Sequence, residues 1–295
     1  MSVSIGCVPI VWNNVDLPDL GPAVAFDEIM DAYVELGYEG TQHGRGFPEG
    51  EVLAGALARR GLRFAELYSA LSATPEGLAP RAGDIARRDL GRVIAARGEV
   101  LNVALDGSAE REGWSGRVGA GAPRWPAAAY DELVALLAEL AAASPTGVRV
   151  TFHPHTATWI EAPEEVDELA ARLPGTGAGL CLDTGHHLVG GGDPVEALDR
   201  YGDLVTHVHV KDVDPAVVAR LRAGEMESFG SAIRERIFTE PGRGILDLDG
   251  VLRSLAARSY AGWLMVEQDS SWLPPVEAAR IGGDAVAEAL ARVTG

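Results

Sequence analysis

Short apolar runs alternate along nearly the whole chain with longer segments whose apolar positions recur at helical spacing. The short runs have the length and composition of β-strands. We expect eight strands, over Ser4–Pro9, Gly40–Gln42, Arg63–Tyr68, Val100–Leu105, Val148–Phe152, Ala178–Asp183, Val205–Lys211 and Trp263–Glu267. The longer segments predict helices over Ala25–Leu36, Glu51–Arg60, Pro80–Arg97, an Ala- and Leu-rich stretch ending at Ala143, Pro163–Leu173 and Val276–Val293. Strand then helix, repeated without a break in composition, favours a (β/α)8 barrel over a doubly wound sheet.

The length of the chain suits one barrel domain. With 295 residues and 47% hydrophobic content, the chain can bury one large core. We therefore expect residues 1–295 to form a single domain. Residues 213–244 interrupt the pattern, and we expect them to form an inserted loop with a helix over the mouth of the barrel.

Polar side chains concentrate on the segment from Leu180 to Asp212. Between Val205 and Val210, valines alternate with His207 and His209, and Lys211 continues the polar series. This alternation places the two histidines and the lysine on one face of a strand. In a closed parallel barrel that face is the interior, where ligands bind.

The carboxyl ends of the expected strands carry the candidate chemistry, because barrels of this kind perform their reactions there. The polar residues at or just beyond these ends are His153, His155, Glu161, Asp183, His186, His207, His209, Lys211 and Glu267. Carboxylates and imidazole from separate strands are what a divalent metal with open coordination positions requires. Oxygen-rich ligation with one histidine suits Mn²⁺, Co²⁺ or Mg²⁺, whereas a structural zinc site would more often use cysteine.

Each candidate also has a structural interpretation. Asp183 precedes Thr184 and Gly185, so its side chain could cap a helix or turn. His43 and His187 are better explained as buried structural residues than as ligands. His207 and His209 share a strand face, and we choose His209 as the one that reaches a central ion. Glu267 ends an apolar strand, where an unpaired carboxylate would be costly, so a metal or cationic partner is expected for it.

Composition and charge narrow the partners. The chain carries 43 acidic and 25 basic residues, a net charge of -18, which argues against nucleic acid or an anionic membrane as a partner. Cys7 and Cys181 are too few and too far apart for a disulfide framework. The N-terminal residues lack the pattern of a secretory signal, and no long apolar run predicts a membrane span, so a cytoplasmic location is expected. The expected partner is a small molecule, and homo-oligomerisation is left open.

Motifs along almost the whole chain resemble the xylose-isomerase-like barrels and, within them, the inosose dehydratase family of myo-inositol catabolism. The matching residues are Trp12, Asn14 and Asp16–Gly21 after the first strand, His153-Pro154-His155 with Glu161, Leu182–His186, His207–Asp212, Glu240–Gly242 with Gly244, and Gly262–Asp269. Gln42-His43 departs from the pattern, because a Glu-containing segment is expected there in the dehydratases. This departure bears on the substrate, since residues after the second strand face the same cavity.

The resemblance implies metal-assisted enolisation of a polyol ketone. Its metal ligands would be Glu161, Asp183, His209 and Glu267. Glu267 or Glu161 would also act as the base, and His155 would be the acid that protonates the departing hydroxyl. Substrate would be held by Lys211, His186, Asn14 and Trp12.

Three functions are compatible with this interpretation. The first is dehydration of a keto-inositol or similar keto-polyol. The second is isomerisation or epimerisation of a sugar, or cleavage of a keto-glycoside, because these reactions start from the same enediolate. The third is a non-catalytic barrel that binds a polyol or a partner protein, and a complete ligand set argues against it.

Overall fold

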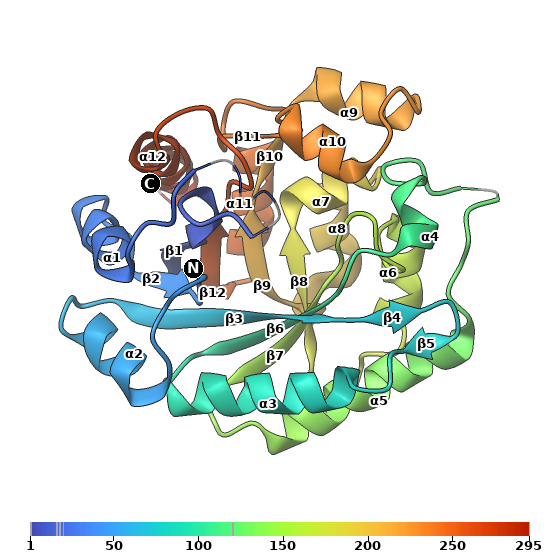
Figure 1. The fold of residues 1–295 in the computed structure, drawn as a ribbon, viewed down its shortest axis with the longest axis horizontal. Helices are drawn as coiled ribbons and strands as arrows, with labels where there is room; N and C mark the ends of the chain where they lie inside the picture. The colour runs from blue at the N-terminus through green and yellow to red at the C-terminus, as the bar shows by residue number, and fades with distance from the viewer. Residues whose placement is uncertain (1, 16, 18, 20, 120, 295) are drawn as a thin grey trace.

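A closed eight-stranded parallel barrel forms the centre of the molecule (Figure 1). The computed structural model describes residues 2–15, 17, 19, 21–119 and 121–294. Asp16, Pro18 and Leu20 of the N-terminal motif lie outside the described residues. Around the barrel the strands follow the order β1-β12-β9-β8-β7-β6-β3-β2. Their bounds are β1 Ser2–Cys7, β2 Gly40–Gln42, β3 Arg63–Leu71, β6 Val100–Leu105, β7 Arg149–His153, β8 Gly179–Asp183, β9 Val205–Val210 and β12 Ala261–Val266. The predicted (β/α)8 barrel is confirmed.

Helices cover the outside of the barrel. Those of the outer layer are α1 Phe26–Glu35, α2 Gly50–Ala58, α3 Ala82–Ala95, α5 Ala127–Ala143, α6 Pro163–Ala170, α8 Pro194–Tyr201, α11 Leu248–Ala257 and α12 Pro275–Thr294. Short helices α4 Ala109–Glu112 and α7 Thr184–Val189 lie in the loops that follow β6 and β8. Among the described residues, none of the helices has the length and apolar composition needed to cross a bilayer.

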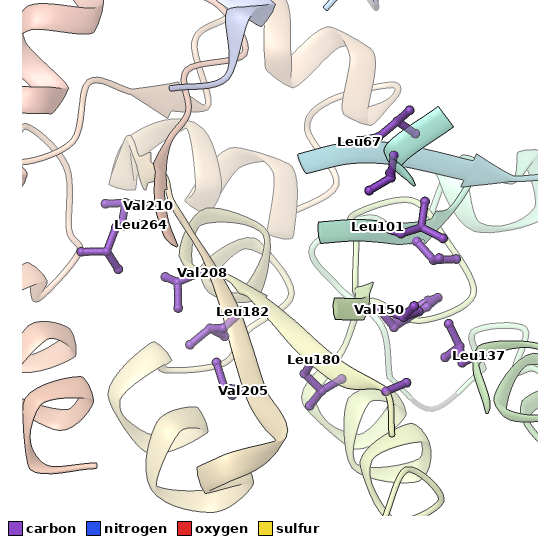
Figure 2. Packing of buried hydrophobic residues seen from close by; sticks show 14 of the residues in the cluster. Leu67, Leu101, Leu137, Val150, Leu180, Leu182, Val205, Val208, Val210 and Leu264 are labelled. Atoms are coloured by element: carbon purple, nitrogen blue, oxygen red, sulfur yellow. The ribbon is translucent and has the colours of Figure 1, made fainter. Parts of the chain in front are cut away.

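The core lies between the strands and this outer layer. In β8, Leu180 and Leu182 belong to the main hydrophobic cluster, as do Val208 and Val210 in β9 (Figure 2). Burying each such side chain contributes about 1.5–3 kcal/mol. Because neighbouring residues of a strand point to opposite faces, the intervening residues of the same strands face the interior of the barrel.

The first, third, fifth, seventh and eighth strands end at residues other than those expected, and the first and fifth bear on the site. The first strand ends at Cys7, because Pro9 begins a 3-10 helix, Pro9–Val11, rather than continuing the strand. Proline has no backbone N–H to offer a central ladder. The fifth strand runs one residue further than expected, to His153, which pairs with Ala104 of β6. His153 is therefore part of the barrel wall.

The segment after β9 forms a small structure of its own beside the carboxyl ends of β8 and β9 (Figure 1). It contains β10 Asp212–Val213, α9 Pro215–Arg222, α10 Phe229–Arg234 and β11 Phe238–Thr239, with β10 and β11 antiparallel. The carboxylate of Asp212 accepts backbone N–H groups from Gly242, Gly244 and Leu246 at 2.9–3.0 Å. Asp212 therefore holds the loop that contains Gly242, Gly244 and Leu246. This gives a structural role to the Asp of the His207–Asp212 motif and to the glycines that follow Glu240.

Candidate metal and active site

Strand register places the two central residues of the site side by side. Asp183 at the end of β8 pairs with His209 of β9, and both side chains face the barrel interior. One layer below, Cys181 pairs with His207. The alternation that was read from the sequence therefore continues across two neighbouring strands, with His209 in the layer nearer the mouth.

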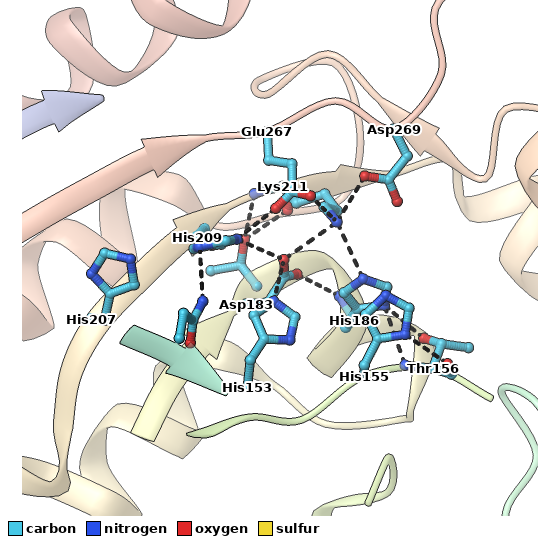
Figure 3. Close-up of polar contacts among 12 residues, drawn as sticks. His153, His155, Thr156, Asp183, His186, His207, His209, Lys211, Glu267 and Asp269 are labelled. Carbon is cyan, nitrogen blue, oxygen red and sulfur yellow. Dashed lines mark hydrogen bonds and ion pairs between the residues drawn. The ribbon is translucent and has the colours of Figure 1, made fainter. Parts of the chain in front are cut away.

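Four side chains from four strands converge at this level (Figure 3). One ligand atom from each lies within 4.8 Å of the others, and the four residues are His153, Asp183, His209 and Glu267. Nδ1 of His209 lies 2.5 Å from Oε2 of Glu267 and 3.8 Å from Oδ2 of Asp183. Nε2 of His153 lies 3.5 Å from the same Asp183 oxygen. All four residues are buried.

The two oxygens of Asp183 have different roles. Oδ1 accepts the backbone N–H of His186 at 2.7 Å and caps helix α7. Oδ2 faces the cluster and, within the described part of the chain, receives no hydrogen bond although it is buried. The capping interpretation is confirmed for Oδ1, and the ligand interpretation stays a prediction for Oδ2.

This donor set fits a divalent cation. Lys211 offsets part of the charge on Oδ2 of Asp183 from 3.4 Å, and a cation at the centre of the four donors would supply the direct contact that this buried oxygen lacks. Two imidazoles and two carboxylates resemble the mixed nitrogen and oxygen sets that hold Mn²⁺, Fe²⁺, Co²⁺ or Zn²⁺, and they suit Mg²⁺ less well.

Lys211 occupies the other side of the two cluster carboxylates. Its Nζ lies 3.1 Å from Glu267, 3.4 Å from Asp183 and 3.0 Å from Asp269. Burial disfavours the charged lysine, but Asp183 and Asp269 hold the pKa of Lys211 well above its usual range. Burial would likewise raise the pKa of Glu267, yet Lys211 and His209 lower it to about 2. Lysine and carboxylates therefore stay charged at neutral pH.

His155 and His186 form a stacked pair beside the cluster. Their ring centroids are 3.7 Å apart, and Nε2 of His186 lies 3.2 Å from Nζ of Lys211. The ring of Phe229, from α10, lies 6.0 Å from His155 and 5.9 Å from His186, so the segment after β9 closes this side of the site. Burial, followed by His153 and Lys211, lowers the pKa of His155 to about 3.

Glu161, one of the predicted ligands, does not join the cluster of four donors. Its two oxygens accept the backbone N–H groups of Gly116 and Ala157, at 2.6 and 2.7 Å. Both oxygens of Glu161 are thus held by the loop backbone. His153, whose direction the following proline obscured in the sequence, takes the β7 position in the cluster.

Trp12 and Asn14 lie on the loop after β1. They line a cavity of about 400 Å³ together with Asp269 and Ser271. Trp12 is buried against Tyr33, with ring centroids 5.4 Å apart. Asn14 donates a hydrogen bond to the backbone oxygen of Asp269, and its Oδ1 accepts the N–H of Leu17 at 2.6 Å. The structure thus gives both residues packing or positioning partners near the mouth and does not place them in the four-donor cluster.

A second cavity is lined by two of the four cluster residues. It has a volume of about 330 Å³, which is at the small end of ligand sites, roughly 300–1,000 Å³. Its polar wall includes His153, His155, Glu267 and Asp269, and Tyr68 and Leu105 contribute to its other side. The predicted acid and one predicted base therefore border the same space.

Sequence comparison assigns the chain to a known family of barrels. The family model described as "Xylose isomerase-like TIM barrel" matches residues 30–289, and the chain belongs to this family. An inosose dehydratase of Clostridium botulinum (strain Eklund 17B / Type B) is 32% identical over 293 residues, which cover 97% of each chain. The rhizopine catabolism protein MocC of Rhizobium meliloti is 34% identical over 297 residues, covering 97% of this chain and 88% of the relative. The inosose dehydratase relatives are enzymes, and this chain is an enzyme of the same family.

Solved structures show the same fold at low sequence identity. An IolI protein with a bound zinc atom superimposes with a TM-score of 0.72 at 14% identity, covering 98% of this chain and 99% of that one. An L-ribulose 3-epimerase also superimposes with a TM-score of 0.72, at 16% identity, covering 100% of this chain and 96% of that one. These similarities concern the barrel itself.

Proposed function

We propose that this chain is a metal-dependent lyase that removes water from a keto-inositol or a similar keto-polyol. The observation that carries the proposal is the convergence of His153, Asp183, His209 and Glu267 beside a charged lysine, with two of the four lining a small cavity. Nearly full-length similarity to an inosose dehydratase supports the choice of substrate class.

Each proposed ligand is a donor of the four-residue cluster. His153, Asp183, His209 and Glu267 would hold the cation, and Mn²⁺ or Co²⁺ is the proposed ion. When bound, such an ion polarises a carbonyl group and stabilises the negative charge that develops on its oxygen. The zinc in the IolI structure supports the choice of a divalent cation.

Glu267 is the proposed base. The neighbouring charges of Lys211 and His209 keep its carboxylate ionised, and it borders the cavity. It would remove the proton on the carbon next to the substrate carbonyl. Lys211, held between Glu267 and Asp269, would donate a hydrogen bond to the substrate oxygen that gains negative charge.

His155 is the proposed acid. Its Nδ1 lies 2.8 Å from the carbonyl oxygen of Thr156, so the ring donates its Nδ1–H there and leaves Nε2 to carry the transferred proton. Burial lowers the pKa of His155, so its ring is neutral at rest, and it would take up on Nε2 the proton that Glu267 removes from the substrate. Transfer of that proton to the β-hydroxyl lets it depart as water. His186, stacked on His155 and in contact with Lys211, would orient both groups.

The proposal is tested by turnover of scyllo-inosose with Mn²⁺ or Co²⁺, followed by mass spectrometry for a product that has lost one water. We expect turnover by the wild type and none after metal removal with a chelator. The Glu267→Gln variant should be inactive, and Glu139→Gln, which changes an exposed carboxylate paired with Arg87, serves as the matched control with normal activity. Recovery of ketose of unchanged mass that carries solvent deuterium would instead favour an epimerase or isomerase. A cytoplasmic location and a homo-oligomeric state stay predictions.

A further inference from the structure

A second polar layer lies inside the barrel, beneath the four-donor cluster. Its residues come from four strands and are fully buried: Glu66 of β3, Asn102 of β6, Thr151 of β7 and His207 of β9. The interior of such a barrel is ordinarily filled by branched apolar side chains. A carboxylate placed there without exposure costs several kcal/mol unless it is well compensated, roughly the penalty for an uncompensated buried ion. The layer therefore calls for a physical explanation.

Hydrogen bonds in this layer converge on Glu66. Thr151 donates to Oδ1 of Asn102 at 2.8 Å, and Nδ2 of Asn102 donates to Oε2 of Glu66 at 3.0 Å. Nε2 of His207 lies 2.8 Å from the same oxygen. Nε2 of His209 lies 2.8 Å from Oε1 of Glu66 and 3.0 Å from Oε2. An ionised carboxylate only accepts hydrogen bonds, so both histidines present an N–H to it.

His209 links the two layers through its two ring nitrogens. Nε2 points down to Glu66, and Nδ1 points up to Glu267 and Asp183. A histidine that binds a metal must leave its ligating nitrogen unprotonated, and its other N–H is usually held by a carboxylate or carbonyl. Glu66 meets this requirement for His209 by accepting Nε2–H, while the Nδ1–H that donates to the ionised Glu267 at 2.5 Å is the proton that a cation would displace.

We propose that Glu66 is a positioning residue that fixes the tautomer and ring orientation of His209, so that Nδ1 is the nitrogen that binds the cation. His207 and Asn102 hold the Glu66 carboxylate in place from the other sides. The inference rests on the metal site of the proposed function but is independent of the substrate. Loss of such a partner typically lowers metal affinity by about 10- to 100-fold.

The alternative arrangement is a second cation between Glu66, His207 and His209, which also lie within 4.8 Å of one another. Nε2 of His207 and Nε2 of His209 lie at hydrogen-bond lengths of 2.8 and 3.0 Å from Oε2 of Glu66, and Asn102 adds an N–H donor to the same oxygen. A donor amide aimed at the oxygen is compatible with a hydrogen-bonded carboxylate and unfavourable beside a cation. The geometry therefore favours the hydrogen-bonded layer.

The test uses the Glu66→Gln variant, with Glu161→Gln as the matched control, because the latter removes another buried carboxylate outside the cluster. Co²⁺ and Mn²⁺ affinities are measured without substrate by titration calorimetry, together with the visible absorption spectrum of the Co²⁺ form. We expect Glu66→Gln to bind about 10- to 100-fold more weakly and to show an altered Co²⁺ spectrum. Glu161→Gln should stay within about twofold of the wild type, since its partners are loop amides.

Unchanged affinity and spectrum in folded Glu66→Gln would overturn the inference, while leaving the proposed dehydratase activity to be judged by its own assay. If the variant does not fold, histidine-¹⁵N NMR of the Zn²⁺-loaded wild type decides. Nε2–H with a metal-bound Nδ1 on His209 is expected, and the reverse pattern contradicts it. Binding of two ions per chain, one of them at Glu66, would also contradict the proposed role of Glu66. A wild type that binds no cation would contradict it as well.

Discussion

The ends of β7 and β12 each lead to a buried glutamate, and the two glutamates have different partners. Glu267 follows directly after Val266, the last residue of β12, and contacts His209 and Lys211. Glu161 follows the end of β7 only after a loop, and its oxygens accept backbone N–H groups. A buried carboxylate needs compensation, and either a charged cluster or loop amides can supply it.

The difference lies in how the chain leaves each strand. A residue next to the last strand position keeps the direction of the barrel wall, so Glu267 faces the common centre. Beyond His153 the loop turns back, and N–H of His155 donates to the carbonyl of Ile160. Glu161 then lies within the loop and organises it. Distance from the strand end thus separates the carboxylate that joins the four-donor cluster from the one that holds a loop.

The largest expected effect is the loss of activity when Glu267, rather than Glu161, is replaced. Replacing Glu267 by Gln removes both a ligand and the proposed base, and we expect kcat to fall about 10³- to 10⁴-fold, or about 4 to 5.5 kcal/mol in activation free energy. Steady-state kinetics on metal-loaded protein measures this. Glu161→Gln should keep most of its metal affinity, and an equal loss of affinity in both variants would contradict the comparison.

The next effect concerns the ion pair that supports the loop after β7. Arg111 and Glu165 are buried and joined by two contacts of 2.6 and 2.8 Å, and Glu165 also accepts the N–H of Glu161. Arg111→Met leaves the Glu165 charge without its partner, so we expect the free energy of unfolding to fall by about 3 to 5 kcal/mol. Urea denaturation measures this. A loss below about 1 kcal/mol would show that the pair is dispensable.

The pKa values of the two carboxyl groups are shifted in opposite directions, so the two groups should affect stability at different pH. Burial raises the pKa of Glu161 to about 7, whereas that of Glu267 is lowered to about 2. Between its unfolded pKa near 4.5 and about 7, Glu161 binds more protons in the folded state, so its contribution to stability is lost as pH rises through this window. The loss is on the order of 3 kcal/mol.

Urea midpoints of the wild type and Glu161→Gln between pH 4 and pH 8 test the sign. The difference between the two curves should change across that window, because Gln does not titrate. A constant difference would mean that the amides of Gly116 and Ala157 keep Glu161 ionised throughout.

The smallest expected effect comes from replacing Asp269, which follows Glu267 on the same loop. Asp269→Asn removes one of the three carboxylates near Nζ of Lys211. The other two, from Asp183 and Glu267, remain within 3.4 Å of it. We expect kcat/KM to fall about tenfold, or about 1.4 kcal/mol, while Mn²⁺ affinity changes little. Kinetics and calorimetry on the same preparation check this, and a large loss of metal affinity would assign Asp269 to the cation instead.

Local patterns determined the architecture and much of the site. Strand and helix periodicity, read along the chain, predicted the barrel, and alternation in β9 predicted that His209 faces inward. Adjacency to strand ends predicted that Asp183 and Glu267 meet. These inferences succeed because in a closed parallel barrel a residue's place on its strand also determines which face and which end it occupies.

Only the tertiary structure decided which neighbours the remaining side chains contact. Glu161 turned to loop amides, His153 entered the cluster as part of a strand one residue longer than expected, and Glu66 reached His209 across the barrel. Alternation in β3 could have indicated an inward Glu66, but not its partner. Backbone hydrogen bonds of an irregular loop, and contacts between strands distant in sequence, have no periodic signature, because they depend on packing of the whole barrel.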